Sequence, residues 1–446
     1  LAVSVLFAVG ATVLIGCDEG IVRDEGGVQE QLQSTKFRHA HLLPQATRGA
    51  GKFGTTVGLI LTLKGDNILD RYQDNILDRY ALLDNILDRY ALQDNILDRY
   101  NILDRYEKWA YVFNGMAVEV PMDSLNALVA EMEQDSLIVW IDPDMNIRPA
   151  IPPDFFDSTG AQVSPWGLTY VGADSVPSRS ASGVEIYVLD SGVSNADVNV
   201  AGRYDFVNYI DNAGDDFDGH GTHIAGLAAA VDDGDGIVGV APGASVYSMK
   251  VVGDDGTADM ANVIAAIDSV VARKIEYPAT PMVVNISLGA DVATTDMTDL
   301  DIAIQQASLV GVVFVVAAGN DGIDVSTVTP AHTPEAITVG AYGQLYQFAS
   351  FSNFGSGIDL LAPGVELISL ASAFHTSGYS LSVRSGTSMS AGFVTGAAAL
   401  YLAQNPSATP AQVEAALVAA GRGDGGNAPG GTTTPSVRMG GGFWTA

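Results

Sequence analysis

Four short motifs carry groups suited to acyl-transfer chemistry, and they follow one another in one order along the chain. They are Asp190-Ser191-Gly192, His220-Gly221-Thr222-His223, Ala317-Ala318-Gly319-Asn320 and Gly386-Thr387-Ser388-Met389-Ser390. A serine hydroxyl is a weak nucleophile at neutral pH and needs a base within hydrogen-bond reach. Neutral imidazole suits that role because its pKa lies near neutrality, and a buried carboxylate fixes its tautomer.

We therefore predict that Ser388 is the nucleophile, His220 the general base and acid, and Asp190 the carboxylate that orients the imidazole. Asn320 would donate its side-chain amide to the oxyanion of the tetrahedral intermediate, with the backbone N–H of Ser388 as the second donor.

Each motif alone has a simpler interpretation. Asp-Ser-Gly is typical of a turn, and Ser388 could be a helix N-cap. His220 and His223 share one side of a helix and could bind a metal, but no acidic residue or third histidine stands at a familiar zinc spacing, so we interpret His223 as structural. An α/β-hydrolase is excluded because its chain order is Ser, acid, His. The four motifs together favour a protease.

Apolar strands and helical segments alternate around these motifs, and Asp190 directly follows one of the strands. This alternation predicts an α/β fold with a doubly wound, mostly parallel sheet flanked by helices, whose site lies at the carboxyl ends of the strands. We expect Ser388 at the N-terminus of a central helix, where the helix dipole favours negative charge. The expected strands cover 184–189, 245–252, 282–288, 312–316 and 337–339, and the expected helices 224–231, 258–273, 297–309 and 389–403.

Residues 164–420 resemble the subtilases, nearer the proteinase K-like branch. The resemblance rests on the motifs above and on Pro165-Trp166-Gly167-Leu168, Val238-Gly239-Val240-Ala241-Pro242-Gly243-Ala244 and Asn285-Ile286-Ser287-Leu288-Gly289. It implies a serine endopeptidase that cuts protein and peptide substrates through an acyl-enzyme and needs no cofactor for the chemistry.

The resemblance also implies a primary specificity pocket with two walls, and a cis peptide bond at Thr329–Pro330 beside it. One wall is formed by Ser287, Leu288 and Gly289, and the other by Ala317, Ala318 and Gly319. Such small, uncharged walls predict apolar or aromatic P1 residues. The chain departs from the family where Gly392-Phe393 replaces the usual Pro-His after the nucleophile.

Residues 52–148 resemble an inhibitor-type (I9) propeptide, so we expect a small α+β domain that templates folding and blocks the cleft of a self-processing zymogen. Its expected elements are strands at 56–63, 111–120 and 138–144 and a helix at 125–132. A Pro- and Asp-containing linker, 149–163, would hold the processing site.

Within this region, Asn-Ile-Leu-Asp-Arg-Tyr occurs five times between 67 and 106. The copies begin at Asn67, Asn75, Asn85, Asn95 and Asn101. Their spacing varies, whereas a solenoid needs a steady period. We interpret the copies as local expansion of an exposed helix and loop; a helical array that binds a partner is the alternative.

Residues 1–17 resemble a bacterial lipoprotein signal. An apolar stretch too short to span a bilayer ends in Gly16-Cys17, and Cys17 is the single cysteine of the chain. We predict lipidation at Cys17, a linker over 18–51, and a lipid-anchored envelope precursor that processing releases as a secreted enzyme. An ordinary secretory signal with an incidental cysteine is the alternative.

The composition is strongly acidic, with 52 Asp and Glu against 21 Lys and Arg and a net charge of −31. This balance excludes nucleic acid as a partner, because phosphate backbones are bound by Lys and Arg. It fits a saline-adapted surface or calcium ligands, for which Asp233 and Asp235 are the candidates; a merely solvated loop is the alternative. We expect a monomer and a Gly/Thr-rich tail, 421–446, without fixed structure.

A second class of function is a catalytically silent subtilase-like binding or chaperone module that acts through the repeats. The presence of all four motifs favours the protease over that module.

Overall fold

The computed structural model describes residues 47–51, 54–63, 93, 96, 103–109, 114–121, 125–132, 134–144, 146–147, 154–156, 162–176, 179–208, 210–211, 214–374, 380–423 and 434–439. The chain divides into two compact units. The first comprises residues 1–146 with 259–268, and the second residues 147–258 with 269–446.

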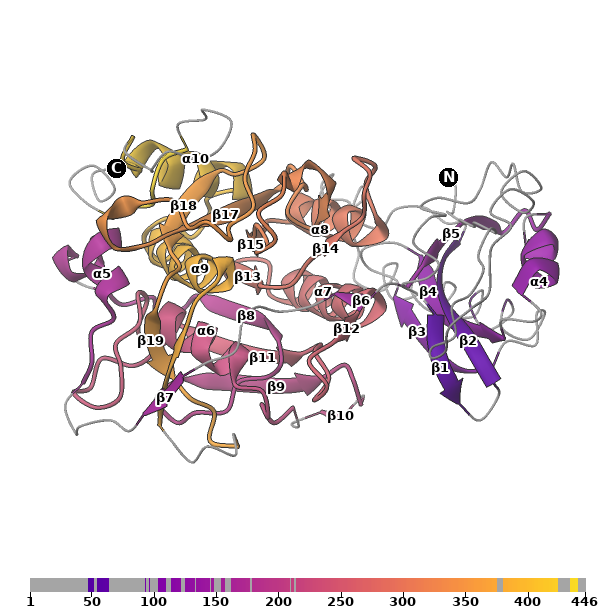
Figure 1. Cartoon of the computed structure of the whole chain (residues 1–446), viewed down its shortest axis with the longest axis horizontal. Coiled ribbons are helices and arrows are strands. Elements are labelled where there is room, and N and C mark those ends of the chain that lie inside the picture. The colour runs from indigo at the N-terminus through magenta and orange to yellow at the C-terminus, as the bar shows by residue number, and fades with distance from the viewer. Residues whose placement is uncertain are drawn as a thin grey trace, which may run out of the picture. The chain divides into compact units, whose positions relative to one another are not determined.

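A sheet of eight strands forms the centre of the second unit, in the order β10-β9-β11-β8-β13-β15-β17-β18 (Figure 1). Neighbouring strands are parallel except for the pair β10 and β9. The bounds are β8 Glu185–Asp190, β9 Val200–Asp205, β10 Ile210–Asp211, β11 Ser245–Lys250, β13 Met282–Ile286, β15 Val312–Ala317, β17 Ala336–Tyr342 and β18 Leu360–Pro363. The residues of β8, β13, β15 and β17 are buried throughout, as expected for parallel strands covered on both faces.

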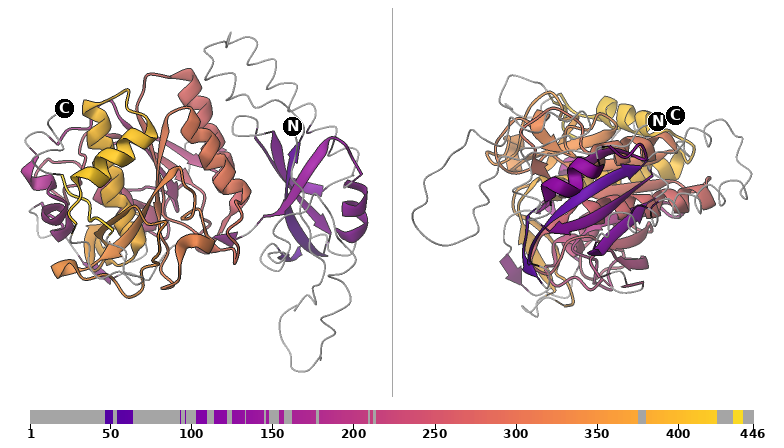
Figure 2. Two further views of the ribbon diagram at one scale, coloured as in Figure 1. Left: turned by 90° about the horizontal axis from the view of Figure 1, so that it is seen from above. Right: turned by 90° about the vertical axis from the view of Figure 1, so that its right-hand side faces the viewer.

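Helices cover both faces of this sheet, which confirms the predicted doubly wound α/β architecture. Helices α6 (His220–Ala229) and α9 (Thr387–Gln404) pack against each other on one face, and α8 (Asp299–Leu309) lies on the other (Figure 2). The second unit also contains α5 Trp166–Val171 and α10 Pro410–Ala420. Helix α7 Met260–Glu276 is divided between the units, with residues 260–268 in the first and 269–276 in the second.

The connections β9–α6–β11 and β13–α8–β15 step in the same direction along the sheet but cross opposite faces. They therefore have opposite hands, so one of them departs from the right-handed rule for parallel strands. This arrangement puts the helix that begins at His220 on the same face as the helix that carries Ser388.

Short strands complete the second unit. They are β7 Asp154–Phe156, β14 Ala290–Asp291, β16 Val328–Thr329, β19 Leu367–Leu370 and β20 Leu381–Arg384. Strand β7 pairs with β20 although it lies in the expected processing linker, and β14 pairs with β16. Strands β6 Asn146–Ile147 and β12 Ala258–Asp259 lie where the two units meet in the sequence.

The first unit has an antiparallel sheet of five strands and the helix α4 (Leu125–Met132). Its strands are β1 Thr47–Gly51, β2 Gly54–Leu63, β3 Leu103–Trp109, β4 Gly115–Pro121 and β5 Ile138–Pro143. Strand β2 pairs with β4 along one edge and with both β1 and β5 along the other. Its apolar side chains, with those of β4, β5 and α4, form a separate buried core. Strand β1 thus lies within the range expected to be linker.

The structure describes the repeats only at 93, 96 and 103–106. Ile96, in the copy that begins at Asn95, is helical and fully buried in the core of the first unit. The copy that begins at Asn101 supplies Leu103–Tyr106 to strand β3. At Ile96 the expected helix is present, but the side chain is buried and not exposed. At 103–106 the expected helix and loop is wrong, because the sheet of the first unit takes up the last copy as a strand.

The expectation of a tail without fixed structure is wrong for 434–439. The backbone N–H of Val437 donates to the carbonyl of Leu361 on β18, and that of Met439 donates to Val171. Val437 and Met439 are buried in the main core. This segment therefore lies along the edge strand β18. The sequence did not predict it, because the surrounding residues are rich in Gly and Thr.

Candidate active site

Asp190 and His220 form a buried carboxylate–imidazole pair at the carboxyl ends of the sheet. Asp190 is the last residue of β8, whose neighbours β11 and β13 are both parallel to it, and His220 is the first residue of α6. Asp190 Oδ1 and His220 Nδ1 are 2.8 Å apart, and the side chains are 0 % and 1 % exposed. Gly219 precedes His220 in the left-handed region at φ 86°, which lets the chain turn abruptly into the helix.

The partners of this pair determine its tautomer. Because the carboxylate accepts, Nδ1 carries the proton and donates to Asp190, which leaves the lone pair on Nε2 of His220. Among the described residues, neither His220 Nε2 nor Asp190 Oδ2 has a hydrogen-bond partner, although both atoms are buried. The arrangement therefore presents an oriented imidazole whose basic nitrogen is unoccupied.

Ser388 is the second residue of α9, and its side chain is buried. Its Oγ lies 3.4 Å from the carbonyl oxygen of Ser287, a long contact that holds the hydroxyl weakly. The start of α9 carries backbone N–H groups without helical partners, which favour negative charge nearby. Ser388 is thus placed where an oxyanion would be stabilised.

Asn320 is bonded to the residue before Ser388. Its Oδ1 accepts hydrogen bonds from the backbone N–H of Thr387 at 2.8 Å and from the Thr387 hydroxyl at 3.1 Å. These bonds fix the amide oxygen toward α9, so the NH₂ end of the Asn320 amide is the end that can donate to an oxyanion.

The two expected pocket walls lie close to the start of α9. Ser287, Leu288 and Gly289 follow β13, and Ser287 exchanges two 3.4 Å contacts with Ser388. Ala317 ends β15, followed by Ala318 and Gly319, and the backbone N–H of Gly319 donates to Thr387 at 3.1 Å. The Thr329–Pro330 bond is cis, as predicted.

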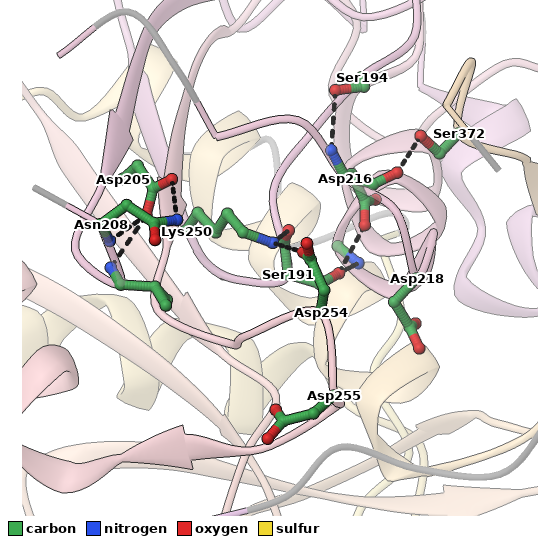
Figure 3. A network of polar contacts seen from close by, with 12 residues as sticks. Ser191, Ser194, Asp205, Asn208, Asp216, Asp218, Lys250, Asp254, Asp255 and Ser372 are labelled. Carbon is green, nitrogen blue, oxygen red and sulfur yellow. Dashed lines mark hydrogen bonds and ion pairs between the residues drawn. The ribbon is translucent and has the colours of Figure 1, made fainter. Parts of the chain in front are cut away.

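Asp216 is a buried carboxylate four residues before His220 that no motif predicted to matter. It accepts hydrogen bonds from the Ser191 hydroxyl at 2.8 Å, from Gly219 N–H at 2.7 Å and from both the N–H and the hydroxyl of Thr222. Burial raises the pKa of the Asp216 carboxyl, and the bonds from Thr222 oppose that shift. Its backbone is held by the hydroxyls of Ser194 and Ser372 (Figure 3). Asp216 therefore fixes the turn that delivers His220.

Ser191 joins the acid and the base. Its N–H donates to Asp190 Oδ1 at 2.8 Å, and its hydroxyl accepts from Gly221 N–H at 3.0 Å. The ammonium of the buried Lys250 donates to the Ser191 carbonyl at 2.9 Å and to Asp254 at 3.0 Å (Figure 3). In the sequence this network could be inferred only from Asp216, four residues before His220, and from Lys250 at the end of a strand.

His223 is structural, as predicted. Its Nε2 lies 3.0 Å from the Leu367 carbonyl, and burial followed by the charge of Arg384 lowers its pKa well below the usual range. Within the described ranges, no group of three or more His, Cys, Asp or Glu side chains is arranged to hold a metal ion. The zinc interpretation of His220 and His223 therefore finds no support.

The calcium candidates have other partners. Asp233 Oδ1 accepts from Asp235 N–H at 3.1 Å, and Asp235 Oδ1 from Gly236 N–H at 2.9 Å, both in an exposed loop. Cys17 lies outside the described residues. In the part of the chain that the structure describes, no helix is both long and apolar enough to cross a membrane.

Phe393, one of the two residues that depart from the family after the nucleophile, packs against Gly167. Its ring is fully buried, and a Cβ added to Gly167 would lie 2.4 Å from the ring atom Cζ. Glycine at 167 is thus required by the large side chain at 393, and the helix α9 remains continuous through both Gly392 and Phe393.

Comparison with known proteins agrees with this geometry. The subtilase family model, Peptidase S8, matches residues 181–438. An extracellular serine proteinase of Thermus sp. (strain Rt41A) is 37 % identical over 317 residues, covering 68 % of this chain and 70 % of that protein. Subtilisin NAT of Bacillus subtilis subsp. natto is 35 % identical over 292 residues, covering 64 % and 70 %.

Among solved structures, a cold-adapted subtilisin-like serine proteinase matches with a TM-score of 0.51 and 33 % identity, over 60 % of this chain and 97 % of that one. The family model matches more than half of the chain, and the ends of the strands in that region hold a buried Asp–His pair. The chain belongs to the subtilase family and is a subtilisin-like serine endopeptidase.

Proposed function

We propose that this protein hydrolyses peptide bonds through Ser388, His220 and Asp190, with Asn320 as an oxyanion donor. The observation that carries this assignment is the buried 2.8 Å bond between Asp190 and His220, which leaves Nε2 of the imidazole as the open basic position. The start of α9 then supplies the nucleophile from the same face of the sheet.

In this mechanism His220 Nε2 removes the proton from the Ser388 hydroxyl as Oγ attacks the scissile carbonyl carbon. Asp190 stabilises the resulting imidazolium through Nδ1–H. The Asn320 amide and the Ser388 N–H stabilise the oxyanion. The imidazolium protonates the leaving amine, and the acyl-enzyme is then hydrolysed by a water that His220 deprotonates.

The substrates are proteins and peptides, and we propose apolar or aromatic P1 residues. Support comes from the small, uncharged walls Ser287–Gly289 and Ala317–Gly319 beside the start of α9. A P1 profile dominated by Arg or Lys would contradict this proposal.

The first unit would act as the inhibitory propeptide. It has its own sheet and its own buried core, as a segment that folds before removal requires. Because β7 pairs with β20 of the second unit, we place the cleavage in the part of the 149–163 linker that precedes Asp154.

The precursor would leave the cytoplasm, in keeping with the relative that is named extracellular. Lipidation at Cys17 would hold it at the envelope, and cleavage after the first unit would release a monomeric mature enzyme. Lipid label that stayed on the processed enzyme would contradict this order of events.

Calcium at Asp233 and Asp235 would be structural. Its support is electrostatic: burial and then the charges of Asp233 and Asp235 raise the pKa of Asp197 to about 6, so a cation there would relieve repulsion. The chemistry itself uses no cofactor in this proposal.

The test is to express the full chain and its Ser388→Ala variant, label both with a fluorophosphonate probe, and sequence the N-termini of the products. We expect labelling and a new N-terminus near residues 149–153 in the wild type only. A wild-type protein that is folded, cleaved and unlabelled would overturn the assignment of Ser388. Unprocessed but labelled protein would overturn self-cleavage alone.

A further inference from the structure

Strand β16 lies between the two proposed pocket walls. Ala290, next to the first wall, pairs with Thr329 in the β14–β16 ladder. A Cβ on Gly289 would lie 3.0 Å from the Thr329 carbonyl oxygen and 3.7 Å from Cγ1 of Val328, and a Cβ on Gly319 would lie 3.8 Å from the same Cγ1. Val328 thus lies close to Gly289 of one wall and Gly319 of the other, so a shift of β16 would change the space at both walls.

One buried carboxylate holds β16 in place. Asp301, in the first turn of α8, is 0 % exposed. Its Oδ1 accepts from the hydroxyls of Thr329 at 2.8 Å and Thr333 at 2.6 Å. Its Oδ2 accepts from the N–H of Thr298 at 2.7 Å, the hydroxyl of Thr298 at 2.8 Å and His332 Nε2 at 2.8 Å. Both oxygens of Asp301 therefore act only as acceptors, which is the behaviour of an ionised carboxylate.

The partners of His332 define its protonation state. Its Nδ1 lies 3.1 Å from the Ser326 carbonyl oxygen, which can only accept. Its Nε2 lies 2.8 Å from an Asp301 oxygen that already accepts two other donors. Both ring nitrogens therefore donate, and only the imidazolium has two N–H groups.

Burial lowers the pKa of His332, but its hydrogen bond to Asp301 and the charge of Asp301 outweigh burial and raise the pKa above its usual value. Burial likewise opposes ionisation of Asp301, and the bond and charge of His332 hold the pKa of that carboxyl below its usual value. Asp301 is the charged group that faces His332 from α8. Glu335, on the same loop as His332, is bonded to Gln305 instead.

We propose that the His332–Asp301 ion pair is the brace that sets the width of the substrate pocket, with His332 as a positioning residue for P1 selectivity. This inference rests on the proposed function, because it assumes that the segments joined by Val328 bind the P1 side chain.

The brace operates within a window of pH. A histidine whose folded pKa is raised contributes stability that is complete below its unfolded pKa and lost as pH rises through the folded pKa. An aspartate whose folded pKa is lowered loses its contribution as pH falls through that value. At alkaline pH, neutral His332 has one N–H for two acceptors, so either the Ser326 carbonyl or Asp301 loses a donor. Selectivity for a large P1 side chain should therefore decline as pH rises.

The experiment compares full-length protein, processed to the mature enzyme, as wild type, His332→Ala, His332→Gln and Gln305→Ala. Gln305→Ala is the matched control, because it removes an α8 hydrogen bond to the same loop without touching Asp301. For each, kcat and KM are measured with peptides that differ only in P1 Phe or Ala, between about pH 5 and 10, a range that spans imidazole titration. Fluorophosphonate labelling of Ser388 reports the chemistry independently of P1.

For His332→Ala we expect the KM of the Phe peptide to rise about tenfold, the effect of losing one hydrogen bond to a charged group, with kcat and labelling unchanged. In the wild type the Phe/Ala ratio of kcat/KM should fall with rising pH. Taking the ratio cancels any pH dependence that the hydrolysis of both peptides shares. His332→Gln keeps a donor toward Asp301 without a titrating proton, so its ratio should stay constant with pH.

Labelled wild type whose Phe/Ala ratio is independent of pH would overturn the inference, as would a His332→Ala enzyme in which labelling and both peptides decline equally. If His332→Ala does not fold, His332→Gln decides by the same ratio. Failure of the wild type to label at all refutes the proposed function instead, so the two failures are distinguishable.

Discussion

The second unit contains two buried carboxylate–imidazole pairs of the same length, Asp190–His220 and Asp301–His332, each 2.8 Å from oxygen to nitrogen. Their surroundings differ. Asp301 accepts from five donors and both nitrogens of His332 have acceptors, whereas Asp190 Oδ2 and His220 Nε2 have no partner within the described residues. Because every polar atom of the Asp301–His332 pair has a partner, the pair is held as an aspartate anion and an imidazolium cation. The open nitrogen of the first leaves it able to take up a proton.

The same residue types at the same distance therefore serve opposite purposes. In the pair at His332 every proton already has an acceptor, so the pair can only hold neighbouring segments together. In the pair at His220 one nitrogen is left to take up a proton, which in the proposed mechanism comes from the Ser388 hydroxyl. The difference is made by hydroxyl and amide neighbours, not by the ionisable side chains themselves.

The largest expected effect separates the two histidines directly. His220→Ala should lower kcat by about 10⁶-fold, the size known for loss of the corresponding histidine in subtilisin. His332→Ala should leave kcat for a P1 Ala peptide near the wild-type value. Steady-state kinetics on active-site-titrated enzyme measures both. Equal losses in the two variants would break the comparison.

The two aspartates should differ in what they damage. Asp301→Asn leaves the buried His332 cation unpaired, so we expect the free energy of unfolding to fall by about 3–5 kcal/mol. Asp190→Asn should instead lower kcat by about 10⁴-fold, the loss known for the same change in a serine-protease triad, through the wrong imidazole tautomer. Denaturant unfolding followed by kinetics on the folded fraction distinguishes them. A stable Asp301→Asn protein would show that the threonine hydroxyls alone hold β16.

Asn320→Ala tests the oxyanion donor proposed beside the Asp190–His220 pair. Loss of one oxyanion donor should lower kcat about 10²–10³-fold with KM little changed; the size comes from subtilisin. Asn405→Ala, at the C-cap of α9, is the control, since its side-chain amide donates to the Tyr401 carbonyl at the other end of the helix from Ser388. A large rise in KM for Asn320→Ala would mean that this amide binds the ground state.

The smallest effect concerns Asp197, a carboxylate for which the described part of the chain shows no ion pair. Burial and the charges of Asp233 and Asp235 raise the pKa of Asp197 to about 6, so its ionisation opposes folding fully above that pH and not at all below its unfolded pKa. Because Asp197 is half-exposed, solvent screening limits the gain from Asp197→Asn to about 1 kcal/mol.

This gain should appear as a higher Tm at pH 8, should fade below about pH 6, and should vanish on addition of calcium if Asp233 and Asp235 bind it. Thermal melts of the two proteins with and without calcium test both statements. An unchanged difference with calcium would argue for a merely solvated loop.

Local patterns predicted the α/β class of the second unit and the site motifs, because central strands such as β8 and β15 are nearly continuous apolar segments. Strand β8 and helix α9 lie where the sequence places them, within one or two residues. The brace at Asp301 was not predictable, since Thr329, His332 and Thr333 follow it 28 to 32 residues later in an ordinary loop. Asp216 was missed because its role depends on burial and on hydrogen bonds from Ser191, Gly219 and Thr222, which no sequence motif marks.

The hexamer repeats show where local sequence patterns fail to predict structure. One copy is helical at Ile96 and the next enters strand β3 at Leu103, although the two copies are identical in sequence. No propensity argument can separate them, because tertiary contacts decide. The strand pairing of the last copy with β4 is a property of the first unit as a whole.

The segment 434–439 has a consequence for biosynthesis. It hydrogen-bonds to Leu361 of β18 and buries Met439, whose N–H donates to the Val171 carbonyl, in the main core. These anchors are translated after every catalytic residue. A nascent chain that already holds Asp190, His220 and Ser388 therefore still lacks the segment that bonds to β18, and the core of the second unit is complete only after residues 434–439 have been synthesised.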